Sequence, residues 1–278
     1  MTPSPGRTAL TAAAARAAHL LVDHAPIVFA DDLAAPLLGD QADALLSYHR
    51  EHGANPILAT ARAEVVCRAR YAETAVLAAV RRGVDQYVVL GAGLDTFALR
   101  NPTAVRVFEV DHPAARAWKA DREKAAGMRS PAVSTPVDLT RESLADGLAA
   151  VGFDLDRPAV VAWLGVSMYL DAATVDRVLG ELGRLAPGSE LVFDHLLPEG
   201  ERDDVGDLYV RAVGPVVAAG GEPWRSFPGV AEATALVRRH GFGSVASVGQ
   251  RESVDAALWE RSDSLRPARV SSLVHARR

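Results

Sequence analysis

Short apolar, β-branched runs alternate with amphipathic stretches from residue 86 to the end of the chain. The amphipathic stretches begin near Pro113, Arg141, Asp171 and Gly229 and are typical of helices. Because neighbouring parallel strands need a helical crossover, this alternation predicts a doubly wound α/β fold around a parallel sheet of seven strands. The predicted strands are 87–90, 105–110, 132–137, 159–164, 190–193, 244–248 and 270–274.

The first sixty residues have a helical pattern instead. Residues 8–22 and 61–82 are good helix formers without glycine or proline, whereas the region between them, 25–57, is punctuated by proline. We therefore expect one domain, with a helical cap at 1–60 and a cofactor-binding α/β core at 61–278. Residues 198–229, rich in glycine, proline and acidic side chains, are expected to form an excursion beside the sheet.

Composition limits the possible partners of this globular chain. Of its 278 residues, 49% are hydrophobic, and 30 basic against 35 acidic side chains give a net charge of −5. This balance provides no excess of positive charge for nucleic acid or an anionic membrane, and no apolar run is long enough to span a bilayer. Cys67 is the only cysteine, which suits a reducing cytoplasm. The sequence therefore predicts a cytoplasmic protein without nucleic-acid or membrane partners.

A glycine pair and an acidic residue mark a candidate ligand site. Gly91 and Gly93 follow the first predicted strand, at the carboxyl edge where open α/β sheets bind ligands. Asp111 ends the second predicted strand, near the spacing at which a carboxylate accepts hydrogen bonds from a ribose diol. Thr96 stands where a dinucleotide site needs a third glycine, so the pattern favours S-adenosylmethionine over a dinucleotide. The alternative is that the glycines only permit a tight turn and that Asp111 caps the helix before Pro113.

At these positions the sequence resembles a known family. The segments that carry the likeness are Arg-Ala-Arg-Tyr at 68–71, Val-Val-Leu-Gly-Ala-Gly-Leu-Asp-Thr at 88–96, Phe-Glu-Val-Asp-His-Pro at 108–113, Pro-Val-Asp-Leu at 136–139 and Gly-Val-Ser-Met-Tyr-Leu at 165–170. As a set they look like the leucine carboxyl methyltransferase family, especially its bacterial small-molecule branch. The resemblance implies a class I, Rossmann-like methyltransferase fold with an antiparallel last strand, S-adenosylmethionine as cofactor and a small-molecule acceptor.

The resemblance also implies which residues bind the cofactor. An arginine fork suits the methionyl carboxylate, and Arg68 competes with Arg70 for this role; for either arginine the alternative is a solvated helix face. Asp138 has a plain helix cap as its alternative. The implied set is Arg70 at the methionyl carboxylate, Gly91 and Gly93 against the cofactor, Asp111 at the ribose, and Asp138 with Leu139 at the adenine.

One position departs from the family pattern. Members of the family often have Glu-Gly at the exit of the fourth strand, where this chain has Leu164-Gly165. The role of that glutamate is therefore not carried over, and adenosyl contacts at Leu164 would be apolar or made through the backbone.

Few residues qualify for the chemical step. Methyl transfer mainly requires alignment, and a carboxylate acceptor needs no general base, whereas a phenol or alcohol benefits from one. Tyr169 and His195 follow the fourth and fifth predicted strands and are expected to face the cleft as catalytic candidates; alternatively, they satisfy nearby backbone groups.

These observations predict an S-adenosylmethionine-dependent O-methyltransferase of a small molecule, with a carboxylate as the favoured acceptor. The fold and the ribose-binding acid also permit a nicotinamide-dependent oxidoreductase. Leu164 leaves a non-catalytic nucleoside-binding protein as a further alternative. No motif with the spacing of metal ligands occurs, so no metal site is expected.

Overall fold

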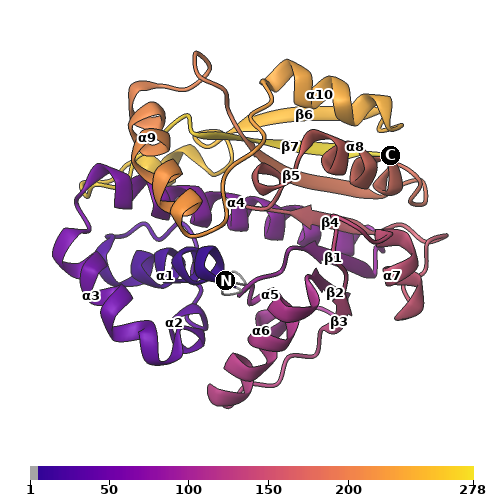
Figure 1. Cartoon of the computed structure of the whole chain (residues 1–278), viewed down its shortest axis with the longest axis horizontal. Coiled ribbons are helices and arrows are strands. Elements are labelled where there is room, and N and C mark those ends of the chain that lie inside the picture. Colours follow the sequence, from indigo (N-terminus) through magenta and orange to yellow (C-terminus); the bar gives the residue numbers. More distant parts are fainter. Residues whose placement is uncertain (1–5) are drawn as a thin grey trace.

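A seven-stranded sheet forms the centre of the molecule. The computed structural model describes residues 6–278, and its strands lie in the order β3-β2-β1-β4-β5-β7-β6 (Figure 1). β1 to β5 pair in parallel, whereas β7 is antiparallel to β5 and β6. This topology confirms the doubly wound, mostly parallel fold with an antiparallel last strand. The bounds are β1 (Gln86–Leu90), β2 (Arg106–Asp111), β3 (Val133–Pro136), β4 (Val160–Trp163), β5 (Glu190–Leu196), β6 (Ser244–Gly249) and β7 (Ser271–Arg277).

The helices differ from the sequence expectation mainly at the start of the longest one. It begins at Pro56 rather than at residue 61, because the side-chain oxygen of Asn55 accepts a hydrogen bond from Ile57 N at 2.9 Å and proline suits the first helical turn. The excursion at 198–229 contains a full helix, α9. The helices are α1 (Arg7–Val22), α2 (Ala34–Leu37), α3 (Ala42–His52), α4 (Pro56–Arg81), α5 (Phe97–Arg100), α6 (Pro113–Ala125), α7 (Leu144–Ala150), α8 (Ala172–Leu182), α9 (Asp204–Ala219) and α10 (Val230–Arg239), with 3-10 turns η1 (Gly39–Gln41), η2 (Ser167–Tyr169) and η3 (Ala256–Trp259).

Helices cover both faces of the sheet. Side chains alternate along β1, so that Val88 and Leu90 pack toward α7, α8 and α10, whereas Tyr87 and Val89 pack toward α4 and α5. Burial on both faces explains why these strands are almost continuously apolar. These helices cover the two faces of the sheet but not the edge at which the parallel strands end, so a site can form at that edge.

The N-terminal helices and α9 cover that edge. Small side chains on α1, among them Ala13, Ala14 and Ala17, let α2 and α3 pack closely around it. Figure 1 shows α1, α2, α3 and α9 on the same side of the molecule, beyond β1 and β4. Among residues 6–278, no helix combines the length and the apolar character that crossing a membrane requires.

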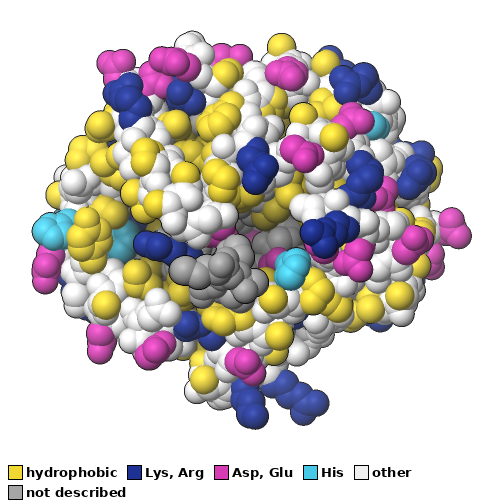
Figure 2. Space-filling model, in the orientation of Figure 1, with side chains coloured by type: hydrophobic (Ala, Val, Ile, Leu, Met, Phe, Trp, Pro, Cys, Tyr) yellow, Lys and Arg dark blue, Asp and Glu magenta, His cyan; other side chains and the backbone are white. Residues whose placement is uncertain are grey.

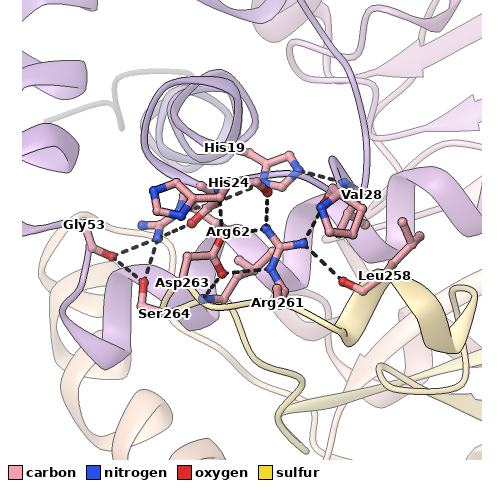
Figure 3. Close-up of polar contacts among 12 residues, drawn as sticks. His19, His24, Val28, Gly53, Arg62, Leu258, Arg261, Asp263 and Ser264 are labelled. Atoms are coloured by element: carbon pink, nitrogen blue, oxygen red, sulfur yellow. Dashed lines mark hydrogen bonds and ion pairs between the residues drawn. The ribbon is translucent and has the colours of Figure 1, made fainter.

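A buried polar network anchors this cap to α4 (Figure 3). The carboxylate of Asp23 accepts hydrogen bonds from Nε and Nη2 of Arg62 at 2.7 and 2.8 Å and lies 2.9 Å from Nδ1 of His19. Burial alone raises the pKa of Asp23, but the hydrogen bonds from His19 and Arg62 outweigh burial and lower the pKa below its usual value. Arg261 extends the network toward the C-terminal part of the chain by donating to the backbone oxygen of His24 at 2.7 Å.

Candidate functional site

A cavity of about 880 Å³ lies between the cap and the carboxyl edge of the sheet. One end is formed by the loop between β1 and α5, which contains both glycines of the predicted site. Side chains of α1, α3, α4 and α9 form much of the remaining wall. The cavity therefore connects the predicted cofactor loop with a region enclosed by helices.

The glycine loop packs closely against the protein on both sides. Gly91 and Gly93 have φ angles of +67° and +46°, which glycine adopts at little cost. A Cβ at Gly91 would lie 2.2 Å from a methyl carbon of Val166, and one at Gly93 would lie 3.1 Å from Cβ of Ala9 in α1. Both glycines line the cavity, and larger residues would displace the walls on either side of the loop.

Asp111 joins the end of β2 to this loop. Its Oδ2 accepts a hydrogen bond from Gly93 N at 2.8 Å, and its Oδ1 accepts one from His112 N at 2.8 Å. Burial raises the pKa of Asp111. The cap of α6 is His112, whose ring accepts from Ala114 N at 3.2 Å, so the alternative in which Asp111 caps that helix does not hold. Each carboxylate oxygen retains a lone pair that can accept a ribose hydroxyl.

Helix α4 brings Arg68 to the cavity rather than Arg70. The Nη1 atom of Arg68 donates to Oδ2 of Asp194 at 3.0 Å, and the rest of its guanidinium lies against Gly165 in the cavity wall. Arg70 instead donates to the backbone oxygen of Val28 at 2.9 Å and is not among the lining residues. Two positions along a helix turn the side chain by about 200°, which explains why only one of the pair faces the cavity.

Asp194 on β5 was not identified from the sequence. Its Oδ1 accepts a hydrogen bond from Gly165 N at 2.6 Å, so one buried carboxylate holds both Arg68 and the turn after β4. The only sequence signal was an acidic residue within an apolar strand, where a charge needs a partner.

His195 lies on the opposite face of the sheet. Side chains alternate along β5: Asp194 faces α4 and Leu196 lines the cavity, whereas the ring of His195 lies 6.0 Å from that of Phe193 in the core beneath α8 and α10. Burial lowers the pKa of His195, and neither ring nitrogen has a hydrogen-bond partner among the described residues. The structure thus corrects the expectation that His195 faces the cleft.

Tyr169 lines the cavity, as expected from the sequence. It belongs to η2, directly after the turn that contains Gly165, and burial raises the pKa of its phenol. The neighbouring Met168 backbone oxygen accepts a hydrogen bond from Arg225 N at 2.6 Å. This bond connects η2 with the loop that follows α9.

The third predicted strand contributes less to the cavity than expected. Asp138 closes its own turn, because its Oδ1 accepts hydrogen bonds from Thr140 N at 2.9 Å and Thr140 Oγ1 at 2.6 Å. Leu139 is buried in the core on the face of the sheet that α7, α8 and α10 cover. Neither residue is among those that line the cavity. Asp138 does not cap α7 either, since Ser143 does so.

Glu64 lines the cavity and was not identified from the sequence. It lies one helical turn before Arg68 on α4 and is only 6% exposed. Its Oε1 accepts a hydrogen bond from Gln250 Nε2 at 2.5 Å and its Oε2 accepts one from Ser271 Oγ at 2.5 Å. Burial raises the pKa of Glu64 to about 7. The sequence signal was the four-residue spacing from Arg68, but both hydrogen-bond partners are distant in the chain.

The cap is tied directly to the glycine loop. Arg16 on α1 donates from Nη2 to the backbone oxygen of Leu94 at 2.6 Å and from Nε to Oδ2 of Asp31 at 2.8 Å. The Oδ1 atom of Asp31 accepts a hydrogen bond from Oγ1 of Thr96 at 2.8 Å. Thr96, which occupies the place of a dinucleotide site's third glycine, therefore holds the cap in place.

Comparison with known proteins decides the family. The model of the leucine carboxyl methyltransferase family matches residues 9–183, more than half of the chain. The chain belongs to the leucine carboxyl methyltransferase family. It is 30% identical over 222 residues to "Putative S-adenosyl-L-methionine-dependent methyltransferase YktD" of Bacillus subtilis, across 76% of this chain and 71% of YktD. A Parafrankia protein with the same functional description is 36% identical over 200 residues, across 68% of this chain and 62% of that protein.

Solved structures share the fold of this leucine carboxyl methyltransferase family member. A Thermobifida fusca protein described as a "putative methyltransferase" has a TM-score of 0.62 at 20% identity, covering 99% of this chain and 96% of that one. A DUF574 family protein from Streptomyces avermitilis has a TM-score of 0.57 at 17% identity, covering 95% and 96%. Both likenesses concern the arrangement of helices and strands.

S-adenosylmethionine is the cofactor of this leucine carboxyl methyltransferase family member, and its activity is methyl transfer. The cavity fits that cofactor. The glycine loop and the Asp111 carboxylate lie together in the cavity wall, and both oxygens of that carboxylate keep lone pairs for further donors. Leu164, the departure from the family pattern, also lines the cavity.

Proposed function

We propose that the protein transfers the methyl group of S-adenosylmethionine to an oxygen atom of a small molecule bound in the same cavity. A volume of about 880 Å³ is within the range of cavities that bind small molecules. The contact between Asp111 and Gly93 on the cavity wall carries the proposal. It holds the Asp111 carboxylate beside the glycine loop, where that carboxylate can accept hydrogen bonds from the hydroxyl groups of a ribose. The helix-enclosed end of the cavity leaves room for the acceptor.

At the cofactor end, the chain's own residues divide the binding tasks. We assign Asp111 to the ribose hydroxyls and the backbone at Gly91 and Gly93 to close contact with the cofactor. Arg68 takes the methionyl carboxylate, because its fork has one bond to Asp194 and N–H groups left over for a second carboxylate.

The assignment to Arg68 replaces the sequence-based choice of Arg70. For Asp138 and Leu139, contact with the adenine stays a proposal that rests on the family resemblance.

The cofactor supplies a methyl group on a positively charged sulfur. The chain's contribution is to align the acceptor oxygen and exclude water, for which Leu164, Met168 and Tyr169 line the cavity near Arg68. Good alignment of reacting groups contributes up to about 10 kcal/mol. The bond from Arg16 to Leu94 holds the cap over the loop during this step.

Two kinds of acceptor oxygen suit such a cavity. The family resemblance favours a carboxylate, which is ionised at neutral pH and needs no base. A hydroxyl group is the second candidate, and Glu64 favours it, because a buried carboxyl in the wall can take up a proton. Of the sequence-based catalytic candidates, Tyr169 is positioned to contact the acceptor, whereas His195 is not.

We also propose that residues 1–60 and 61–278 act together as one domain with a small-molecule substrate. Both parts contribute to the cavity wall. Figure 2 shows basic and acidic side chains intermixed over the described part of this face. A nucleic-acid backbone needs a more continuous basic surface.

Calorimetric titration tests the cofactor assignment. S-adenosylmethionine and S-adenosylhomocysteine are expected to bind, and NAD and NADP are not. Asp111→Ala should weaken S-adenosylhomocysteine binding at least about tenfold, because hydrogen bonds to a charged acceptor contribute about 1.5–3 kcal/mol each. Asp121→Ala, an exposed position on α6 outside the cavity, is the matched control and should bind normally. A folded Asp111→Ala protein with unchanged affinity would contradict the proposal.

A further inference from the structure

Beyond the glycine loop, the cavity continues into a largely apolar chamber. Its wall includes Leu45 of α3, Ile57 and Val65 of α4, and Val213 and Val216 of α9. Such a lining favours an acceptor with an extended apolar part, because removing apolar surface from water is favourable.

The imidazole of His49 also lines this chamber. Burial, together with the nearby positive charge of Arg62, lowers the pKa of His49 to about 4, so the ring is neutral at neutral pH. His49 therefore adds no positive charge that would attract an anionic acceptor.

Glu64 is a carboxyl in the wall of this chamber. Neutral donors, Gln250 and Ser271, hold its two oxygens in place, and its side chain forms no ion pair among the described residues. Each oxygen still has a lone pair for a further donor. A hydroxyl group of a bound acceptor can therefore donate to Glu64.

The arginines that line the cavity pair with other groups or lie in solvent, so none of them is free to bind a carboxylate beside Glu64. Arg16 lies 2.8 Å and Arg100 lies 3.5 Å from the carboxylate of Asp31, beside the glycine loop. Arg68 is assigned to the methionyl carboxylate, and Arg225 is exposed to solvent. A carboxylate acceptor in the chamber would thus meet the carboxyl of Glu64 without a nearby positive partner, which is unfavourable.

We propose that Glu64 accepts the proton of the acceptor's hydroxyl group and that the acceptor is an apolar molecule with an ionisable, phenolic or enolic, hydroxyl. This inference rests on the proposed methyl transfer. The acceptor O–H bond breaks and its proton goes to the Glu64 carboxylate, while the acceptor oxygen bonds to the methyl carbon. The electron pair of the broken carbon–sulfur bond stays on the sulfur, so charge and atoms balance.

The surroundings of Glu64 support this role. Burial, helped by the carboxylates of Asp194 and Asp203, outweighs the hydrogen bond from Ser271 and the charge of Arg68 and raises the pKa of Glu64 to about 7. A base that is half ionised near neutral pH can both accept and release a proton. The titratable and charged groups that face it are Cys67 and Arg68 on α4, Asp194 on β5, and Asp203 and Tyr209 at the start of α9 and within it.

Binding of three matched probes tests the inference without knowledge of the natural acceptor. S-adenosylhomocysteine is first titrated into the full-length protein, and its failure to bind would count against the proposed function itself. The loaded protein is then titrated at pH 8 with 2-naphthol, 2-naphthoate and 2-naphthylmethylamine. We expect 2-naphthol to bind at least about tenfold more tightly than 2-naphthoate. One hydrogen bond from the naphthol hydroxyl to the ionised Glu64 carboxylate accounts for a difference of this size.

The Glu64→Gln variant gives the decisive comparison, because glutamine retains the shape and can still bond to Gln250 and Ser271. Its preference for 2-naphthol over 2-naphthoate should fall about tenfold, while S-adenosylhomocysteine binding stays unchanged. Glu232→Gln, exposed on α10, is the control and should keep the wild-type preference. Binding of 2-naphthoate by wild type as tight as that of 2-naphthol or of the amine, binding of none of the probes, or an unchanged preference in Glu64→Gln would overturn the inference.

Where a naphthol is also turned over, the pH profile distinguishes a catalytic role from a structural one. The wild-type rate should rise through a pKa near 7 and level off, since the ionised form of Glu64 is the active one. Glu64→Gln should lower the rate about a hundredfold and remove that rise. A rise that persists in Glu64→Gln would assign the proton acceptor to another group.

Discussion

Helix α4 carries two arginines that each meet an aspartate, yet the two pairs have different surroundings. Arg62 and Asp23 make two parallel hydrogen bonds of 2.7 and 2.8 Å, and both side chains are fully buried. Arg68 and Asp194 make one of 3.0 Å, and the Arg68 side chain is 21% exposed, at the cavity. The first pair therefore joins the cap to α4, whereas the second leaves part of its fork for a ligand.

The difference shows that the partners of a charge reveal more about its role than its burial does. Asp23 accepts from two side chains and is enclosed by protein, which is typical of a structural ion pair. Asp194 accepts from Arg68 and from the backbone of Gly165, so it fixes a side chain of the cavity wall and a loop at once. Breaking each pair should consequently change different properties of the protein.

The largest expected effect comes from Arg62→Met. This change leaves the carboxylate of Asp23 buried without its bidentate partner, and breaking such a pair costs about 3–5 kcal/mol of unfolding free energy. Urea denaturation followed by circular dichroism measures the loss. The folded fraction should still bind S-adenosylhomocysteine with wild-type affinity. A loss below about 1 kcal/mol would mean that this pair is no more important for stability than a surface pair.

The second prediction contrasts Glu64 with Asp23 through pH. Burial raises the pKa of Glu64 from its usual 4.5 to about 7, so its contribution to stability is fully present below the unfolded pKa and is lost as pH rises through 7. Between about pH 4.5 and pH 8 the wild type should lose about 3 kcal/mol relative to Glu64→Gln, which does not titrate there. Denaturation of both proteins across this range measures the difference.

Asp23 should show the opposite sign. Its pKa is lowered in the folded protein, so its contribution is present above the unfolded pKa and is lost as pH falls through the folded pKa. The penalty of Asp23→Asn should therefore shrink in acid. A gap between wild type and Glu64→Gln that is constant with pH would contradict the raised pKa of Glu64.

The third prediction compares the two neighbouring arginines of the Arg-Ala-Arg-Tyr segment. Arg68→Lys should weaken S-adenosylmethionine binding about tenfold, or 1.4 kcal/mol, because a point charge cannot replace a fork shared between two carboxylates. Arg70→Lys should bind within about twofold of wild type, since a lysine can still reach the backbone oxygen of Val28. Calorimetry on both variants measures the contrast, and the reverse outcome would return the role to Arg70.

The fold and the place of the glycine loop were predictable because their signals are local. Runs and spacings of fewer than thirty residues predicted the seven strands and the position of Gly91, Gly93 and Asp111 at one edge of the sheet. The start of α4 was misplaced because Pro56 looked like a break, although Asn55 before it is a helix cap.

The rest of the site depends on rotation and on distant partners. Every residue of β5 is buried, so its pattern did not show which face Asp194 and His195 take. Glu64 is held by Gln250 and Ser271, 186 and 207 residues away, and no spacing in the sequence connects them. The choice between Arg68 and Arg70 likewise depended on which face of α4 points to the cavity, and the sequence did not show this.

The smallest expected effect concerns Asp31, which combines features of both pairs. Like Asp23 it is a buried carboxylate of the cap, and like Asp194 it is bonded to an arginine that lines the cavity. Thr96→Val removes the hydrogen bond from Thr96 to Asp31 and the one from Arg100 to Thr96. Because Arg16 and Arg100 both stay close to Asp31, unfolding free energy should fall by only about 1 kcal/mol. If this bond holds the cap on the glycine loop, S-adenosylhomocysteine should dissociate several-fold faster, with little change in its association rate. Urea denaturation measures the loss of unfolding free energy, and stopped-flow measurement gives the dissociation rate. An unchanged dissociation rate in a destabilised protein would mean that Asp31, like Asp23, contributes to stability and not to ligand binding.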